Sequence, residues 1–499
     1  MTVLVALPVV IPMIAGALAL ALWRSLFAQR VVGVGGAAAL LAASLWLLLE
    51  VWREGVLVMH MGEWVAPYGI VFVADLLAAI MLAFAALTGF IVAVYSLSMV
   101  DEPEEHFGYY PLFHLLLAGV AGVFLTGDIF NLYVWIEVLL VASFALLTLG
   151  GERAQMEGAI KYVTLNLLSS ILLLAGVGLT YGLFGSLNMA DLADKFGQVE
   201  ETGLLTTVGM LFLVAFAIKA AAFPFFFWLP ASYHTPHVAV TALFAGLLTK
   251  LAVYVLFRLF SLMYDHDVEF THHVVLMWIA GFTMLTGVLG AAAQFEFRRI
   301  LSFHIVSQIG YMIMGLALYT PLALAGGIIF IVHNMVVKTN LLLISGVTYR
   351  LGGSYELKKL GGFYRSHPGL SILFLVSAMS LAGIPPLSGF IAKFVVIRAG
   401  VEVASWPIVV VALITGLLTL YSMVKIWAEV FWKAPPADAP ERPQVGGSLW
   451  PVYTAIGIMA ALAVLIGVAI EPLFVLAEAA AEQMLDADSY IEAVLGDRS

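Results

Sequence analysis

The sequence predicts an all-α integral membrane protein, and three of its properties lead to that fold class. The chain of 499 residues is 63% hydrophobic and only 11% charged, and its mean hydropathy is +1.05. Long apolar segments alternate with short polar connections, and basic residues are distributed unevenly among those connections. An ordinary soluble domain carries roughly 25% charged residues, and no soluble interior of this size hides so much apolar surface.

The apolar segments predict about 14 transmembrane helices, because a span needs about 20 mainly apolar residues. The first segment has neither a basic leader nor a small-residue cleavage site, so we expect a retained span and not a signal peptide. No connection is long enough to fold alone, which predicts a single membrane domain over residues 1–499. The expected spans are approximately 3–23, 31–51, 69–98, 109–126, 129–149, 160–186, 203–228, 236–260, 273–294, 300–319, 321–349, 369–396, 405–432 and 451–478.

The basic residues test this count, because cytoplasmic connections of membrane proteins are enriched in Lys and Arg. With both termini outside, 12 of the 22 Lys and Arg, including Arg442, lie on the cytoplasmic side and five lie outside. This bias predicts a multi-pass protein of the cell membrane with both termini on the outer side. The five outer residues are Arg53, Lys195, Arg258, Arg398 and Arg498.

Two acidic segments are expected to face water. The run of Asp101, Glu102, Glu104 and Glu105 lies in a cytoplasmic connection and predicts a solvated connector. The tail from Glu478 onward is acidic as well, and we expect it to form a short surface helix outside.

Five lysines remain, and topology does not explain them: Lys219, Lys250, Lys338, Lys393 and Lys425 fall within apolar segments. Each costs about 3 kcal/mol at mid-bilayer depth. Together they cost about 15 kcal/mol, which is comparable with the net stability of a whole domain. For Lys425, close to the loop at residue 433, snorkelling toward the membrane surface is the simpler interpretation. Because the other four lysines are too costly to bury without a role, we expect them to have a function.

Glu137, in the segment FNLYVWIEVLLVASF, has no other charge in its span and supplies an acidic counterpart. Burial favours the neutral form of a lysine, whereas a nearby carboxylate favours the charged form. A Glu–Lys pair that separates and closes can therefore release and recapture a proton. His304 and His333 add side chains that titrate near neutral pH. Together these residues predict a buried proton relay.

Two of the expected spans contain helix-breaking residues. AIKAAAFPFFFWLP carries Lys219 before Pro224, and LAGIPPLSGFIAKF carries Lys393 after Pro385 and Pro386. Proline opens a membrane helix where the freed backbone groups line a cavity. The seventh and twelfth spans are thus broken, five spans apart, which predicts two inverted five-helix repeats. We assign 109–260 to the first repeat, 273–432 to the second, and 433–499 to the last span and tail.

Composition also excludes several classes of function. The formal net charge of -10 leaves no basic surface for nucleic acid. Without cysteine the chain has no thiolate metal site, iron–sulfur cluster or disulfide, so we expect no cofactor and assign any redox centre to a partner. His234 and His237 have a metal-compatible spacing but no neighbouring carboxylate, so a polar loop is preferred and no metal site is expected. His272 is expected in an exposed outer loop, and Asp75 either orients the third span or faces an entry funnel.

Several long motifs resemble the antiporter-like membrane subunits shared by respiratory complex I, membrane hydrogenases and multisubunit Mrp-type cation/proton antiporters. WLPASYHTPHVAVTALFAGLLTKLAVYVLFR surrounds Lys250 and resembles the family's broken seventh and eighth helices. The D subunits of the Mrp type are the most similar. The motifs that carry this similarity are GDIFNLYVWIEVLLVASFALLTLGG around Glu137, RRILSFHIVSQIGYMIMGLAL around His304, HNMVVKTNLLLISG around Lys338, and GIPPLSGFIAKF around Lys393.

The resemblance implies a proton relay that runs from an entry pair through a central lysine to a terminal site. Its members would be, in that order, Glu137, Lys219, Lys250, His333, Lys338 and Lys393. One position departs from the family, because Asn334 stands where relatives commonly carry histidine. His333 is displaced from that position by about 100° around the helix.

The function that this resemblance implies is exchange of cytoplasmic Na+ for external H+ by an assembly of hydrophobic subunits in the lipid bilayer. The chain would be a secondary active transporter subunit and not an enzyme. The alternative is the proton-pumping subunit of a complex I or membrane-hydrogenase-type oxidoreductase, in which the same relay would serve. A self-sufficient transporter is less expected, because the relatives work as assemblies.

Overall fold

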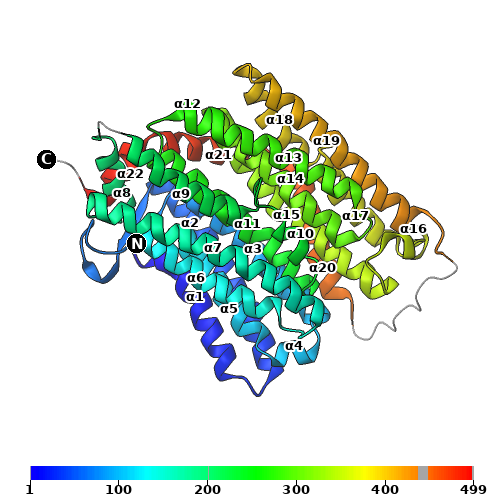
Figure 1. Ribbon diagram of the computed structural model, residues 1–499. Helices are drawn as coiled ribbons and strands as arrows, with labels where there is room; N and C mark the ends of the chain where they lie inside the picture. Colours follow the sequence, from blue (N-terminus) through cyan, green and yellow to red (C-terminus); the bar gives the residue numbers. More distant parts are fainter. Residues whose placement is uncertain (1, 200–201, 437–447, 497–499) are drawn as a thin grey trace.

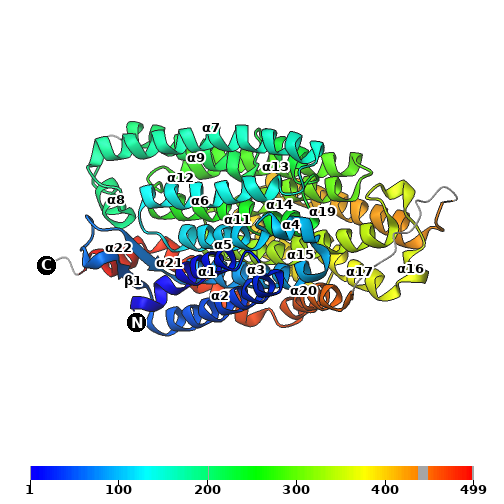
Figure 2. The same cartoon turned by 90° about the horizontal axis from the view of Figure 1, so that it is seen from below.

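The chain forms a bundle whose long helices run roughly along one common direction (Figures 1 and 2). The computed structural model describes residues 2–199, 202–436 and 448–496, so Arg442 and Arg498 lie outside the described residues. Within these ranges, twelve helices are long and apolar enough to cross a membrane. Every predicted segment contains helix, but segment 109–126 forms a shorter helix and segment 369–396 is divided in two.

The first half of the chain contains most of the non-helical structure. A two-stranded antiparallel sheet of β1 and β2 precedes α3, so the predicted span 69–98 is wrong at its start. The elements of this half are α1 (Thr2–Ala21), α2 (Leu26–Glu54), β1 (Leu57–His60), β2 (Val71–Ala74), α3 (Leu76–Met99), α4 (Glu102–His106), α5 (Tyr109–Leu125), α6 (Ile129–Leu147), α7 (Arg153–Phe184), α8 (Met189–Phe196), α9 (Gly203–Ala220), α10 (Trp228–Ser232) and α11 (Val238–Leu262).

The second half continues the bundle and ends on α21, which packs against α15, and on the short α22. The predicted tail helix is present as α22, although Tyr490 and Ile491 on it are buried. The elements are α12 (Val268–Phe270), η2 (Thr271–Leu276), α13 (Met277–Ala293), α14 (Phe297–Leu318), α15 (Pro321–Gly352), η3 (Leu357–Lys359), α16 (Phe363–Ser366), α17 (Pro368–Ala382), α18 (Ser388–Glu402), α19 (Trp406–Ile426), η4 (Trp427–Trp432), α20 (Trp450–Val468), α21 (Glu471–Leu485) and α22 (Ala487–Leu495).

Polar residues fix where several of these helices begin. The side chains of Asp75, Asp128 and Glu296 accept hydrogen bonds from backbone N–H groups in the first turns of α3, α6 and α14. A helix start leaves four such N–H groups without intrahelical partners, and a capping side chain satisfies one of them. Asp75 therefore orients the third span, as one of its two predicted roles required.

The core of the bundle lies along α11 and α15. All the residues in the spanning windows of these two helices are buried, and α14 between them is 94% buried. The peripheral helices α2 and α7 are only 33% buried, which leaves their outer faces for lipid. Lys250 and Lys338 are therefore carried by the two helices that are most completely shielded from the bilayer.

Both predicted breaks are present. The chain leaves α9 at Ala220 and resumes helix at Trp228, and it leaves α17 at Ala382 and resumes at Ser388. Each broken helix is fourth in a run of five: α5, α6, α7, α9–α10 and α11, then α13, α14, α15, α17–α18 and α19. A third break was not predicted. The segment 451–478 is divided between α20 and α21 at residues 469–470.

Two expectations of exposure are wrong. Glu105 of the acidic run is fully buried and forms a 2.5 Å ion pair with Arg30 of α2. His272 is buried as well, with Nε2 hydrogen-bonded to the carbonyl of Phe260 at 2.9 Å. Arg258, which was assigned to the outer side, is buried near the end of α11 and pairs with Asp75 at 2.6 Å.

Candidate functional site

The first predicted pair lies at the break between α9 and α10. Lys219 is 6% exposed, one residue before α9 ends, and its Nζ donates to Ser170 Oγ of α7 at 3.1 Å. Glu137 on α6 acts electrostatically on this lysine, but no ion pair within 4.0 Å joins them. The Glu137 Oε1 atom is buried, and no described residue supplies it with a hydrogen-bond partner. Glu137 and Lys219 thus interact through their charges at a distance, without forming an ion pair.

Lys250 lies near the middle of α11 and is completely buried. Its Nζ donates to the carbonyl of Ala245 at 2.5 Å and approaches Thr249 Oγ1 at 3.4 Å, so its hydrogen bonds stay within its own helix. Its charge acts on His333 and Lys338 of α15. Lys250 therefore lies within electrostatic reach of the polar residues at the centre of α15.

Lys338 and His333 occupy the centre of α15, and both are completely buried. Lys338 Nζ has no hydrogen-bond partner among the described residues. His333 Nδ1 is 2.8 Å from Ser388 Oγ at the start of α18, and Ser388 Oγ is 3.0 Å from Ser380 Oγ on α17. His333 thereby reaches both halves of the second broken helix.

Asn334 does not take part in the contact that His333 makes with Ser388 of α18. Its Nδ2 donates to the carbonyl of Phe330, one turn earlier on α15, at 3.0 Å. The amide is thus used within its own helix, whereas His333 points across to α18. Of these two neighbouring side chains, His333 is therefore the one that contacts α18.

Lys393 on α18 folds back over the second break. Its Nζ donates to the last two carbonyls of α17, Leu381 at 2.9 Å and Ala382 at 3.0 Å, and lies 5.4 Å from the ring centre of Tyr311. The C-terminal end of a helix carries a partial negative charge, so these carbonyls stabilise the ammonium form. The break at Pro385 and Pro386 frees the carbonyls that hold Lys393.

His304 belongs to the buried polar residues that predict a relay, although the order of relay members implied by the family resemblance does not include it. It is completely buried on α14, and neither ring nitrogen has a hydrogen-bond partner among the described residues. The charges of Lys338, Lys393 and Lys425 all act on it. Sequence reasoning missed Ser170 and Ser388, because a serine gives no signal until its partner across the bundle is known.

Lys425 has a different environment from the other buried lysines. It is half-buried, and its Nζ donates to the carbonyls of Ala292 at 2.8 Å and Gln294 at 2.7 Å, where α13 ends. A cation at this position satisfies carbonyls that have no intrahelical partner. We assign Lys425 a capping role, which agrees with leaving it out of the relay.

The site as a whole is a row of charged and polar groups, in which several buried atoms lack a protein partner. Buried polar atoms in native proteins are hydrogen-bonded to protein or to ordered water. Groups of this kind in a row are suited to proton transfer through water. Within the described ranges, the atoms without a protein partner include Glu137 Oε1, Lys338 Nζ, His333 Nε2, Asn334 Oδ1 and both ring nitrogens of His304.

The histidine pair of the YHTPH motif is part of a polar loop, as expected. His234 lies between the carbonyl of Pro230 and Arg299, and His237 Nε2 is 2.8 Å from the carbonyl of Met99. No group of three or more metal-ligating side chains occurs in the described part of the chain.

Comparison with known proteins identifies the family. Residues 126–419 match the model described as "NADH:quinone oxidoreductase/Mrp antiporter, TM". The chain is 45% identical over 493 residues to the D subunit of the Na(+)/H(+) antiporter of Alkalihalophilus pseudofirmus, covering 99% of both chains. It is 38% identical over 492 residues to the D subunit of the Bacillus subtilis Na(+)/H(+) antiporter, covering 98% of this chain and 99% of the relative.

A solved structure agrees with these relatives. A chain of the Mrp complex from Dietzia sp. DQ12-45-1b superposes with a TM-score of 0.90 at 32% identity, over 99% of this chain and all of that one. The chain therefore belongs to the NADH:quinone oxidoreductase/Mrp antiporter family of multi-pass membrane subunits and, within it, to the D subunits of Mrp Na+/H+ antiporters.

Proposed function

We propose that this subunit translocates the protons of the antiporter, which exchanges cytoplasmic Na+ for external H+. One observation carries the proposal: Lys250 and Lys338 lie on the two most buried helices, between broken helices that carry Lys219 and Lys393. Charges at this depth are costly, and the ones found there mark proton or ion pathways. In the described part of the chain, none of these four lysines has a carboxylate within 4.0 Å.

The mechanism that we propose begins at the first break. A proton that reaches Glu137 neutralises the carboxylate and removes its attraction for Lys219. Lys219 is then free to give up a proton toward Lys250, and the added charge at Lys250 repels those at Lys338 and Lys393. Like charges in a medium of low dielectric constant repel over several ångströms. Protonation of Glu137 thereby changes the electrostatic energy of the charged form of Lys393.

The energy for exchange comes from the membrane potential and the pH gradient. One elementary charge that crosses 100 mV gains about 2.3 kcal/mol. The chain in this proposal is a secondary active transporter subunit and catalyses no chemical reaction of its own. Its partners are the other hydrophobic subunits of the complex, and Na+ movement is coupled to the row through repulsion within that assembly.

We propose further that residues 109–260 and 273–432 are two inverted repeats, and that 433–499 supplies the last span and the tail. The support is the matching place of the broken helix in each set of five. In this arrangement each repeat provides half of the row, with Lys219 and Lys250 in the first and His333, Lys338 and Lys393 in the second.

A second candidate function is the proton-pumping subunit of a redox-driven complex, because the matching family includes NADH:quinone oxidoreductase subunits. Copurification separates the two. Peripheral iron–sulfur or flavin proteins bound to this chain would support the redox-driven complex, whereas a set of small hydrophobic subunits alone supports the antiporter.

The relay is tested with Glu137→Ala and Lys219→Ala in the complete antiporter complex, reconstituted in vesicles. We expect Na+-dependent proton exchange to fall about a hundredfold, the scale on which a lost proton-transfer group acts. Lys195→Ala is the matched control, because Lys195 pairs with Asp191 on the surface helix α8. If either relay variant exchanged as fast as the control while assembling normally, the row would not be the proton path.

A further inference from the structure

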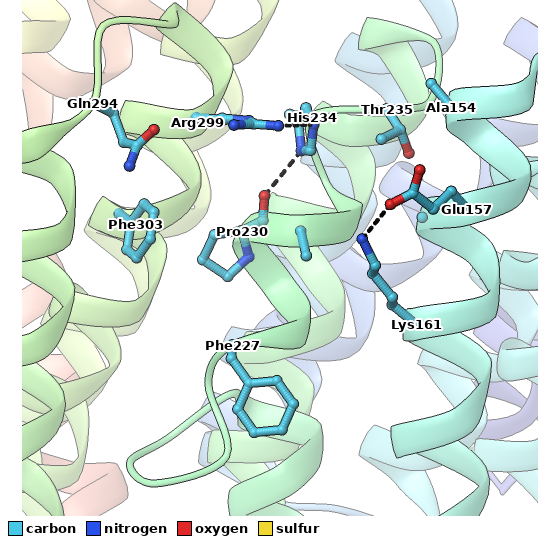
Figure 3. Close-up of a pocket in the computed structure, with 12 residues that line it drawn as sticks. Ala154, Glu157, Lys161, Phe227, Pro230, His234, Thr235, Gln294, Arg299 and Phe303 are labelled. Atoms are coloured by element: carbon cyan, nitrogen blue, oxygen red, sulfur yellow. Dashed lines mark hydrogen bonds and ion pairs between the residues drawn. The ribbon is translucent and has the colours of Figure 1, made fainter.

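A pocket that the relay does not use opens between α7, α10 and α14. Its volume is about 410 Å³, and Figure 3 shows the residues that line it. It lies where α7 and α14 begin, so it is at one end of the membrane-spanning bundle. We call it the α7–α14 pocket and define it by Glu157 and Lys161 of α7, Phe227 and His234 around α10, and Arg299 and Phe303 of α14.

Arg299 supplies a positive charge that no close ion pair neutralises, although Glu296 interacts with it at longer range. In the described residues, no carboxylate lies within 4.0 Å of its guanidinium. Its neighbour Arg298 differs, because it pairs with Glu296 at 3.6 Å and lies 3.7 Å from the ring centre of Tyr355. The Arg299 side chain is exposed and is held in the pocket by His234.

The hydrogen bonds of His234 keep the ring neutral. Arg299 donates to Nε2 at 3.1 Å, so the other nitrogen, Nδ1, carries the proton and donates to the carbonyl of Pro230 at 2.9 Å. Burial, and then the charges of Arg299 and Arg298, lower the pKa of His234 to about 4. His234 therefore positions the guanidinium without adding a charge.

Across the pocket, Lys161 forms a 2.6 Å ion pair with Glu157. These two charges cancel, so Arg299 leaves the pocket with a net charge of about +1. The charged side chains gather at one end of the pocket in Figure 3, and Phe227 lies at the other end. Phe227 is 58% exposed, and Ile160 on the neighbouring outer face of α7 is 65% exposed. The pocket thus has a cationic end, which suits the charged headgroup of a phospholipid, and an apolar end, which suits its acyl chains.

We propose that the α7–α14 pocket binds the phosphate headgroup of an anionic phospholipid, with its acyl chains along Phe227 and the outer face of α7. Arginine binds phosphate oxygens through charge-assisted hydrogen bonds in a planar fork. Basic pockets between membrane helices are suited to anionic headgroups. Because Phe227 and Pro230 belong to the segment that follows the first break, the lipid would hold that segment against α7 and α14.

The test uses the complete complex in nanodiscs that contain phosphatidylcholine and phosphatidylglycerol, with the lipids retained after extraction counted by native mass spectrometry. Wild type is expected to retain phosphatidylglycerol over phosphatidylcholine. Arg299→Gln is expected to lower that enrichment about fivefold, equivalent to the roughly 1 kcal/mol that one basic residue contributes at an anionic surface. Arg365→Gln is the matched control, because Arg365 is also exposed on a connection but lies outside the pocket.

A second variant keeps all the charges of the α7–α14 pocket and fills only its volume. Ala154→Phe, on an exposed residue of the pocket lining, is expected to lower the enrichment as Arg299→Gln does. The proposal is overturned if both variants retain as much phosphatidylglycerol as the Arg365→Gln control. It is also overturned if millimolar inorganic phosphate displaces the lipid completely, because the site would then be one for free phosphate.

Discussion

Buried charges in this chain are of two kinds, which differ in whether a partner of opposite charge lies within reach. Arg258 and Asp75 pair at 2.6 Å, and Arg30 and Glu105 pair at 2.5 Å. Lys338, by contrast, has no hydrogen-bond partner among the described residues. A fixed ion pair stabilises one arrangement, whereas an unpaired buried charge is costly and persists where function requires it. The first kind is therefore structural and the second is the candidate relay.

The Arg258–Asp75 pair predicts a specific pattern of stability. Arg258→Met leaves the carboxylate of Asp75 buried without a counter-charge, which is expected to lower the free energy of unfolding by roughly 3–5 kcal/mol. Adding Asp75→Asn removes that charge but keeps a side chain able to cap α3, so the double variant is expected to regain part of the loss. Thermal denaturation of the purified complex measures both. A double variant no more stable than Arg258→Met would contradict this assignment.

Glu104 predicts a dependence of stability on pH. Burial, and then the charges of Asp101 and Glu152, raise the pKa of Glu104 to about 7. A carboxyl group with a raised pKa binds its proton more tightly in the folded state, so stability falls as the pH rises from the usual range of glutamate toward 7. Glu104→Gln removes this loss. We expect its melting temperature to exceed that of wild type by about 1–2 °C at pH 8.5 and to match it at pH 4.5.

The matched control for this prediction is Glu102→Gln, because Glu102 belongs to the same short helix but is exposed. Melting curves of wild type and both variants at the two pH values are sufficient. An equal gain in Glu104→Gln at both pH values would show that the carboxyl does not titrate in this range.

At the scale of elements, the breaks at α9–α10 and α17–α18 were predicted from the sequence because proline leaves a local signal. The break between α20 and α21 was not predicted, although Glu471 and Pro472 follow it directly and begin α21. A close tertiary contact lies beside this break as well. A Cβ atom on Gly467 would lie 2.1 Å from the carbonyl oxygen of Pro386, so glycine allows α20 to approach the second break closely. Two interruptions thus meet in space although about 80 residues separate them in sequence.

The second broken helix depends on another glycine. A Cβ atom on Gly389 would lie 1.8 Å from the carbonyl oxygen of Ser380 and 2.8 Å from Cε1 of His333. Gly389→Ala is therefore expected to separate α17 from α18, displace His333 from Ser388, and cost about 1–3 kcal/mol of stability. We expect Na+/H+ exchange to fall with it. Gly457→Ala on α20 is the control, because its Cβ would meet nothing within 4 Å and both stability and exchange should persist.

At the scale of the whole molecule, the sequence was sufficient for the fold class and for the burial of Lys219, Lys250, Lys338 and Lys393, because hydropathy and isolated charges are local signals. Their role in a relay stays a prediction. The sequence was not sufficient for Glu105, Arg258 or His272, whose burial depends on partners elsewhere. Arg258 meets Asp75 across 183 positions of sequence, and Glu105 meets Arg30 across 75. The prediction that Glu105 is solvated was wrong, because an acidic run indicates a solvent-exposed connection unless a partner such as Arg30 is known.

The arrangement of the basic residues predicts the orientation of the chain, and the absence of cysteine makes that orientation measurable. Tyr68, 90% exposed between β1 and β2, is expected outside, and Ser366, exposed at the end of α16, is expected in the cytoplasm. A membrane-impermeant maleimide should label Tyr68→Cys in intact cells and Ser366→Cys only after permeabilisation. The cysteine-free parent chain is the control and should remain unlabelled. The reverse pattern would place both termini in the cytoplasm and invert the direction in which protons meet Glu137 and Lys393.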